Sequence, residues 1–218
     1  MGAAGAHWRA AYEALAVQRS REFNDRAAAT EVRLRTEQAL ARARIERELS
    51  LRDPLTQLHN RRFFDAMIER CVADARAASA DGHLLFVMVD IDRFKAINDR
   101  HGHAAGDAVL VQFAQRLRSV ARAQDHLVRW GGEEFLLLLN AASRADGEVV
   151  AQRLLQEITG RSFELPGGLL TPVTCSIGWC AFAPGRASPA PATWHDALAL
   201  ADARLYEAKR AGRNRAVG

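Results

Sequence analysis

The spacing of apolar residues changes near residue 53. From Ala6 to Asp53 there is neither Gly nor Pro, and Ala, Arg, Glu and Leu dominate, so one long helix is predicted. Towards its end, seam positions recur at spacings of three and four, as in a coiled coil: Leu34, Gln38, Ala41, Ile45 and Leu49. We interpret this helix as a stalk through which two chains form a parallel dimer. The alternative is a single helix that packs back on its own domain.

The composition also changes at the end of this helix, which we interpret as a domain boundary. Asp53 is a suitable N-cap and Pro54 a suitable first helical residue, so a short helix is predicted to start there. Asn60 can cap a second helix, which has one apolar face. The predicted units are therefore a helical segment over residues 1–52 and a globular domain over residues 53–218.

Two segments of the globular domain predict β-structure. Residues 84–89 form a continuous apolar run, typical of a central strand covered on both faces. The run ends at Asp90 and Asp92, which the alternation of a strand places on the same side. Residues 126–139 contain two β-prone segments separated by Gly131-Gly132, the pattern of a tight β-hairpin.

The remaining periodic segments complete a mixed order of strands and helices. An amphipathic helix with Leu110, Phe113 and Leu117 on its apolar face is predicted between the central strand and the hairpin. The later elements are a helix over Asp146–Thr159, a strand over Pro172–Phe182 with a close approach or bulge at Gly178, and a helix capped by Thr193. The order β-α-β-β-α-β with a final helix predicts an α+β, ferredoxin-like fold.

Composition excludes several classes of protein. Of the 218 residues, 49% are hydrophobic and 26% are charged, which suits a soluble domain with a substantial core. No apolar run is long enough to span a membrane, and no secretory signal is present. The three cysteines have no zinc-type spacing and lie in apolar surroundings, so a cytoplasmic location is predicted. A net charge of +4 fits an anionic ligand.

Two glycines followed by two carboxylates at the hairpin tip suggest a ligand site. Gly131 and Gly132 let a ligand approach the backbone, while Glu133 and Glu134 place negative charge beside it. The strand that ends at Asp90 is expected next to this hairpin. Carboxylates from both elements would then bind Mg²⁺, or Mn²⁺, that bridges a triphosphate, with two ions in each site. The alternative is an ordinary solvent-exposed turn.

Several motifs resemble those of the GGDEF-domain diguanylate cyclases. The resemblance runs from Asp53 to about Asn214 through Asp53–Arg62, Asp90–Asp99, Gly102–Asp107, Gly131–Phe135 and Leu205–Asn214, in the family's order. Members of that family condense two GTP molecules into cyclic di-GMP and release two pyrophosphates. Their fold is similar to the adenylyl cyclase catalytic core and the polymerase palm, so an active enzyme is expected.

The resemblance implies a role for individual residues. Metal binding is implied for Asp90, the Ile91 carbonyl and Glu133, and catalysis for Asp90, Glu133 and Glu134. One of the two glutamates would take the proton of the 3′-hydroxyl, whose pKa the metal lowers. The implied substrate contacts are Asn98, His103 and Asp107 for guanine, Lys95, Lys209 and Arg213 for the phosphates, and in addition Phe94 and Gly132.

Asp107 is expected to select the base. The N1–H and N2–H₂ groups of guanine lie side by side and match the two oxygens of a carboxylate, whereas adenine presents a lone pair at N1. GTP is therefore predicted to be preferred over ATP. Because each domain would carry only half of the reaction centre, two domains must face each other in an antiparallel arrangement. A homodimer formed through the N-terminal helix would raise the local concentration of the second half.

A further motif precedes the hairpin. Arg122-Ala123-Gln124-Asp125 resembles the RxxD inhibitory site of the family, and Arg153 occupies the position of the usual supporting Arg. Inhibition by the product, cyclic di-GMP, is therefore predicted; the alternative is an ordinary surface ion pair.

A catalytically silent receptor for cyclic di-GMP is the second functional hypothesis. Degenerate members of the family lose the Gly-Gly-acidic signature, which this chain keeps. A nucleic-acid-binding domain is excluded, because the N-terminal segment mixes basic and acidic residues and offers no aromatic platform.

Overall fold

The computed structural model describes residues 33–39, 50–78, 83–141, 143–184 and 191–218. The chain divides into two compact units, Met1–Ser50 and Leu51–Gly218. In the first unit, residues 33–39 are helical and exposed, as the sequence predicts. Most of the predicted stalk, including the seam positions Ala41, Ile45 and Leu49, lies outside the described residues, so the coiled-coil dimer stays a prediction.

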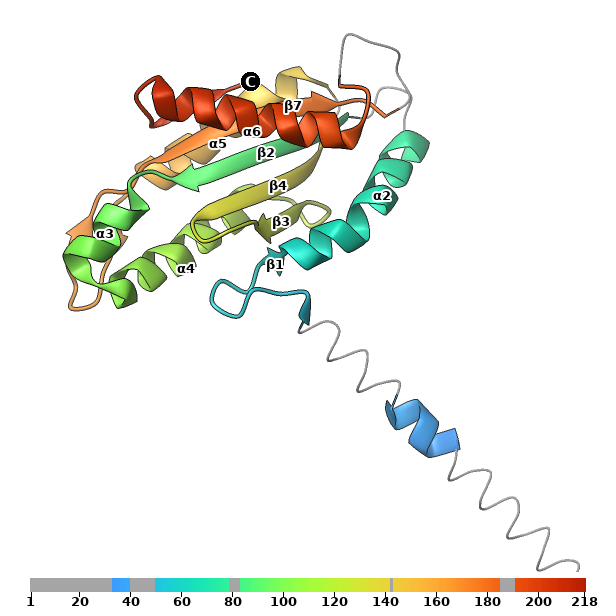
Figure 1. Cartoon of the computed structure of the whole chain (residues 1–218), viewed down its shortest axis with the longest axis horizontal. Coiled ribbons are helices and arrows are strands. Elements are labelled where there is room, and N and C mark those ends of the chain that lie inside the picture. Colours follow the sequence, from blue (N-terminus) through green and yellow to red (C-terminus); the bar gives the residue numbers. More distant parts are fainter. Residues whose placement is uncertain (1–32, 40–49, 79–82, 142, 185–190) are drawn as a thin grey trace, which may run out of the picture. The chain divides into compact units, whose positions relative to one another are not determined.

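Six strands of the second unit form one mixed sheet, in the order β1-β3-β4-β2-β7-β8 (Figure 1). They are β1 (His59–Asn60), β2 (His83–Ile91), β3 (His126–Arg129), β4 (Glu134–Ala141), β7 (Cys175–Phe182) and β8 (Arg215–Val217). The central strand β2 is antiparallel to both β4 and β7, while the outer pairs β1–β3 and β7–β8 are parallel. A separate two-stranded ribbon consists of β5 (Phe163–Glu164) and β6 (Leu170–Thr171).

Helices cover both faces of the sheet. They are α2 (Arg61–Ala78), α3 (Phe94–His101), α4 (His103–Val120), α5 (Ala145–Thr159) and α6 (Trp194–Arg210). The apolar residues of α4 and α5 pack on one face, and those of α2 and α6 on the other. The order β2-α4-β3-β4-α5-β7 is the predicted β-α-β-β-α-β order, so the α+β prediction is confirmed. None of the helices described here is long and apolar enough to cross a membrane.

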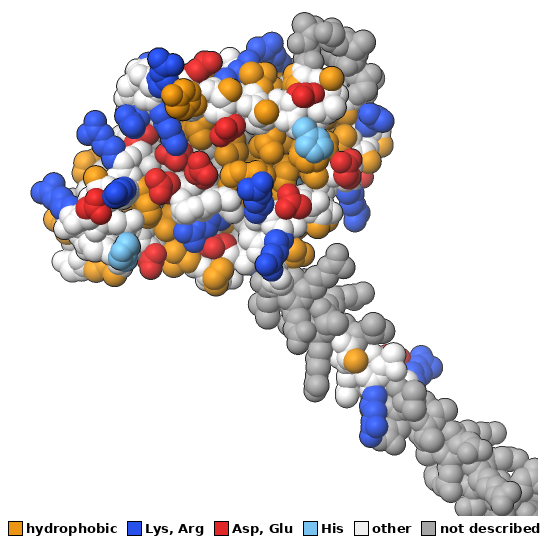
Figure 2. All heavy atoms as spheres, in the orientation of Figure 1, with side chains coloured by type: hydrophobic (Ala, Val, Ile, Leu, Met, Phe, Trp, Pro, Cys, Tyr) orange, Lys and Arg blue, Asp and Glu red, His pale blue; other side chains and the backbone are white. Residues whose placement is uncertain are grey.

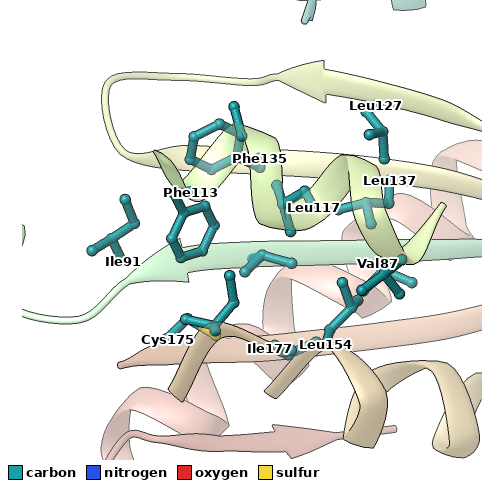
Figure 3. Packing of buried hydrophobic residues seen from close by; sticks show 14 of the residues in the cluster. Val87, Ile91, Phe113, Leu117, Leu127, Phe135, Leu137, Leu154, Cys175 and Ile177 are labelled. Carbon is teal, nitrogen blue, oxygen red and sulfur yellow. The ribbon is translucent and has the colours of Figure 1, made fainter. Parts of the chain in front are cut away.

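The alternation along β2 decides which side chains each face receives. Leu85, Val87 and Val89 belong to the core beneath α4 and α5, in which the rings of Phe113 and Phe135 stack at 5.0 Å between centroids (Figure 3). The alternate residues of β2, Leu84, Phe86 and Met88, pack on the opposite side against α2 and α6. By the same alternation Asp90 lies on the α6 side.

The helix boundaries follow the predicted caps. Asn60 Oδ1 accepts a hydrogen bond from the Phe63 N–H at 3.2 Å, and Thr193 forms a reciprocal capping box with Asp196. Gly178 is a close approach rather than a bulge, because a Cβ at this position would overlap the α6 backbone at Ala201 and Leu205. The two cap predictions depend on local sequence alone, which explains why they are confirmed, whereas the close approach at Gly178 results from the packing of α6 on β7.

Two boundaries differ from the prediction. No helix starts at Pro54: Asp53 Oδ1 accepts from the Thr56 N–H at 2.8 Å, but the chain turns back at Gln57, whose φ is 57°. The strand predicted over Pro172–Phe182 is β7, which begins at Cys175 and not at Pro172, since Pro172 has no N–H to donate to a sheet. The two residues before Pro172 pair instead with β5.

Candidate active site

The structure brings the acidic hairpin tip next to the end of β2. Asp90 and Glu134 are cross-strand partners, and the Ile91 N–H donates to the Glu133 carbonyl at 3.3 Å. Asp90 is only 6% exposed, whereas Glu133 and Glu134 are half-buried. Three carboxylates, from the end of β2, the hairpin turn and the start of β4, therefore lie close together on the α6 side of the sheet. Figure 2 looks onto this side, where acidic side chains lie among Lys and Arg side chains.

The glycines of the hairpin leave its backbone bare. The N–H groups of Trp130 and Gly131 both donate to the Glu134 carbonyl, at 2.8 and 3.2 Å, which closes the turn. A Cβ on Gly131 would lie 2.9 Å from Glu134 Oε2, so a side chain there would push that carboxylate away. A Cβ on Gly132 would meet nothing within 4 Å, so open space for a ligand lies beside its backbone.

Arg129 holds this turn in place, a role that sequence reasoning missed. Its Nε and Nη2 donate to the Gly132 carbonyl at 3.2 and 2.8 Å, and its Nη1 donates to both Asp53 oxygens at 3.0 and 3.1 Å. Burial acts to raise the pKa of Asp53, but hydrogen bonds from Thr56 and Arg129 outweigh it and the pKa is lowered. The turn at the start of the domain is thereby joined to the glycine turn. The only sequence signal was an Arg that precedes the two glycines.

Lys209 supplies the nearest positive charge. This residue of the last turn of α6 places its Nζ 2.7 Å from Asp90 Oδ2. The pKa of Asp90 is nevertheless raised from 3.8 to about 6, chiefly because the carboxyl is buried. Lys209 lowers this pKa, while the charges of Glu133 and Glu134 raise it further. The Lys209 ammonium therefore neutralises only part of the negative charge of Asp90, Glu133 and Glu134.

This donor set fits a hard divalent cation. Carboxylate and carbonyl oxygens are the ligands that Mg²⁺ and Mn²⁺ prefer, and Mg²⁺ typically uses one or two carboxylates together with substrate phosphates. Within the described ranges, no three His, Cys, Asp or Glu side chains form a ready-made cluster that could hold a metal alone. Burial of the Asp90 carboxyl raises its pKa although Lys209 lies beside it, and a bound cation would favour the ionised form.

The residues expected at the guanine base lie on α3 and the start of α4. Gly102, with φ 82°, ends α3 and begins α4, and His103 is the first residue of α4. A Cβ on Gly106 would overlap the Asn98 side chain, so Asn98 lies against the first turn of α4. Gly106 directly precedes Asp107 in the sequence. The structure therefore brings Asn98 close to the α4 turn that carries Asp107, whose side chain is exposed.

Three further residues predicted to contact the substrate differ in how far their side chains are exposed. Phe94 is 7% exposed and its side chain packs in the core, so its backbone is the part that a substrate can approach. The expected substrate contact at Phe94 therefore stays a prediction, and its backbone would make it. Lys95 and Arg213 are exposed, the latter in the turn after α6, four residues beyond Lys209.

The residues of the predicted inhibitory site line one cavity at the opposite end of β4. Arg122, Asp125 and Arg153 are among the residues around a hollow of about 290 Å³. Asp125 is oriented by backbone N–H groups of Arg122 and Asn140, at 2.7 and 3.3 Å. The Arg153 guanidinium donates to the Val120 carbonyl. The structure thus places the three residues together, with the base of the hollow formed by apolar side chains of β2 and β4.

Comparison with known proteins identifies relatives that match more than three quarters of this chain. The chain is 42% identical over 170 residues to the diguanylate cyclase DgcP of Pseudomonas aeruginosa, which covers 78% of this chain and 24% of DgcP. It is 39% identical over 172 residues to the response regulator PleD of Caulobacter vibrioides, covering 78% of this chain and 36% of PleD. The chain thus spans only about a quarter to a third of the length of these relatives.

Solved structures share the fold. The coiled coil and GGDEF domain of DgcB from Caulobacter crescentus, in complex with c-di-GMP, superposes with a TM-score of 0.76 at 27% identity, covering 88% of this chain and 97% of that chain. The GGDEF domain of TpbB (YfiN) from Pseudomonas aeruginosa has a TM-score of 0.68 at 37% identity, covering 76% and 92%. The family described as "Diguanylate cyclase, GGDEF domain" matches residues 50–215, and the chain belongs to this family.

Proposed function

We propose that the chain is a diguanylate cyclase, which condenses two molecules of GTP into cyclic di-GMP and two pyrophosphates. The observation that carries this proposal is the meeting of Asp90 with Glu133 and Glu134 on adjacent strands, beside Lys209 and the bare backbone of Gly132. The names of DgcP and of other relatives at 33–40% identity support the same activity.

In this proposal each group has a defined task. Asp90, the Ile91 carbonyl and Glu133 hold two Mg²⁺ or Mn²⁺ ions, which neutralise phosphate charge and lower the pKa of the 3′-hydroxyl when bound. Glu133 or Glu134 accepts the proton of that hydroxyl. The Lys209 ammonium already lies at the edge of the carboxylates, 2.7 Å from Asp90, where a phosphate would meet it.

The phosphate and base contacts complete the half-site. Lys95 and Arg213 add positive charge for the triphosphate, and the start of α3, where Arg93 makes no side-chain cap, favours an anion there. Asn98, His103 and Asp107 bind guanine, with Asp107 matching N1–H and N2–H₂. The exposure of Asp107 at the first turn of α4, next to the buried Gly106 on which Asn98 lies, supports this assignment.

One domain supplies only half of the reaction centre, so the proposal requires two domains that face each other with antiparallel GTP molecules. We assign the task of bringing them together to residues 1–52, as a dimeric helical stalk. Support comes from DgcB, whose solved structure is described as a coiled coil and GGDEF domain and covers 88% of this chain.

We further propose that cyclic di-GMP inhibits the enzyme at Arg122, Asp125 and Arg153. The shared cavity of these residues supports this proposal, because an Arg–Asp pair can bind the Hoogsteen edge of guanine and a phosphate together. The complexes of DgcB with c-di-GMP show that a relative of this fold binds the same molecule.

Incubation of the chain with GTP and Mg²⁺, followed by chromatographic and mass analysis, tests the activity. Cyclic di-GMP and pyrophosphate are expected from the wild type, and neither from Glu133→Gln. The second hypothesis, a silent receptor, is favoured by the same cavity. It would be supported by calorimetric binding of cyclic di-GMP without any turnover of GTP across a range of protein concentrations.

A further inference from the structure

Asp92 carries a buried carboxylate that none of the proposed catalytic steps uses. It follows β2 directly and is 6% exposed. Its Oδ1 accepts from the Ser176 hydroxyl at 2.6 Å, and its Oδ2 accepts from the Thr174 hydroxyl at 2.7 Å and from the Asn214 N–H at 3.0 Å. One carboxylate therefore joins the end of β2, the start of β7 and the turn between α6 and β8.

The turn that receives this hydrogen bond has an unusual backbone. Gly212, Arg213 and Asn214 have successive φ values of 113°, 65° and 48°, and residues with a Cβ rarely adopt such values. The Arg213 N–H donates to the Ala208 carbonyl at 3.0 Å, and the next N–H, that of Asn214, donates to Asp92. A third hydrogen bond, from Arg215 Nε to the Arg213 carbonyl at 3.1 Å, lies within the turn itself, so the bond to Asp92 is the one that joins this turn to the end of β2.

The end of α6 is tied to the end of β2 at two points. Lys209 pairs with Asp90 at 2.7 Å, and the Asn214 N–H donates to Asp92 Oδ2 at 3.0 Å. Between these two contacts in the sequence lies Arg213, whose side chain is exposed and makes no hydrogen bond or ion pair with the described part of the chain. The contacts of Lys209 with Asp90 and of Asn214 with Asp92 therefore fix the backbone of Arg213 relative to the end of β2.

We propose that Asp92 is a positioning residue that holds Arg213 in place for the phosphates of the substrate. The inference rests on the proposed function, in which Arg213 binds a phosphate. A buried carboxylate that accepts three hydrogen bonds has a fixed position, and removal of the carboxylate leaves its three donors without their acceptor. Such a group can hold a neighbouring binding side chain in one place. Asp92 does not touch the substrate and acts through the turn.

The test compares the KM for GTP with kcat. In Asp92→Ala the turn loses its external hydrogen bond, and KM is expected to rise about tenfold, the order of one lost charge-assisted hydrogen bond, with a much smaller change in kcat. In Asp92→Asn the amide oxygen can still accept from the Asn214 N–H, so KM is expected to return towards the wild-type value. Calorimetry should show weakened binding of a non-hydrolysable GTP analogue and unchanged binding of guanosine.

A matched control separates positioning from general destabilisation. Arg116 is also 6% exposed and makes three hydrogen bonds, to the carbonyls of Ile158, Arg161 and Ser162. Arg116→Met is expected to lower the melting temperature and to leave the KM for GTP unchanged. A rise in KM in this variant equal to that in Asp92→Ala would overturn the proposal, because any loss of stability would then explain both.

A double-mutant cycle with Arg213→Ala gives the decisive comparison. If Asp92 acts through Arg213, adding Asp92→Ala to Arg213→Ala produces no further rise in KM. Fully additive effects would overturn the proposal. An unchanged KM in Arg213→Ala itself would also overturn it, while formation of cyclic di-GMP by the wild type would leave the proposed function standing. If Asp92→Ala does not fold, the double variant Thr174→Ala/Ser176→Ala is used in its place. It removes both hydroxyl donors, so the Asp92 carboxylate can rotate away from Asn214. An unchanged KM there again overturns the inference.

Discussion

Replacing Asp90 by Asn is expected to stabilise the folded domain and to abolish its activity. Burial, together with the charges of Glu133 and Glu134, raises the pKa of Asp90 from 3.8 to about 6, although Lys209 opposes the rise. A carboxyl whose pKa is higher in the folded than in the unfolded state favours folding only while it is protonated. That contribution is complete below pH 3.8 and is lost as the pH rises through about 6.

The magnitude follows from the two pKa values. The difference between 3.8 and about 6 corresponds to about 3 kcal/mol at pH 8. Asn resembles the protonated carboxyl in shape and charge, so Asp90→Asn should recover up to this amount at pH 8 and little of it at pH 4. For a chain of this length, 3 kcal/mol corresponds to a rise of roughly 6–12 °C in melting temperature.

Denaturant unfolding of both proteins at pH 8 and pH 4, without metal or nucleotide, measures the effect. Asp65→Asn is the matched control, because Asp65 is exposed on α2 and its replacement should change stability by less than about 0.5 kcal/mol. Two results would refute the reasoning: an equal gain at both pH values, or a loss of stability at pH 8. The second would mean that the pair with Lys209 stabilises the fold more than burial of the charge destabilises it.

Three further replacements test other parts of the site. Arg129→Lys cannot contact Asp53 and the Gly132 carbonyl together, so stability should fall by about 1.5–3 kcal/mol and turnover should also fall; unchanged turnover would show that the Gly132 turn is held by other groups. Asp107→Ser should reduce the preference for GTP over ATP about tenfold or more in initial rates, and equal preference in both proteins would remove Asp107 from base selection. Arg122→Ala should relieve inhibition by added cyclic di-GMP while the initial rate is kept, and an inhibition curve identical to that of the wild type would refute the inhibitory site.

The sequence was informative wherever a local pattern has one structural solution. The apolar run before Asp90 can be buried only as a strand covered on both faces, and it became the central strand β2. Asn60 and Thr193 cap the helices that follow them, because a side-chain oxygen at that position satisfies free N–H groups of the first turn. The two glycines between β-prone segments indicated the hairpin.

The sequence was misleading where one residue type serves two purposes. Asp53 was expected to cap a helix, and its carboxylate does accept from Thr56, but it equally serves as the partner of Arg129. The motif that contains Phe94 implies a substrate contact, but it does not state that the side chain lies in the core and leaves the backbone to make that contact. A pattern of residue types does not state which side of a turn a side chain occupies.

Only the tertiary structure decided which distant groups meet. Arg129 is 76 residues from Asp53, and Asn214 is 122 residues from Asp92, so no local spacing connects them. These contacts depend on the order β4-β2-β7 and on a register that aligns Asp90 with Glu134. Local hydrophobic patterns determine which segments become strands and helices, because burial and backbone hydrogen bonding act residue by residue. Strand order and register result from packing of the whole chain, and they alone determine how the carboxylates, Lys209 and the turn of Arg213 are placed.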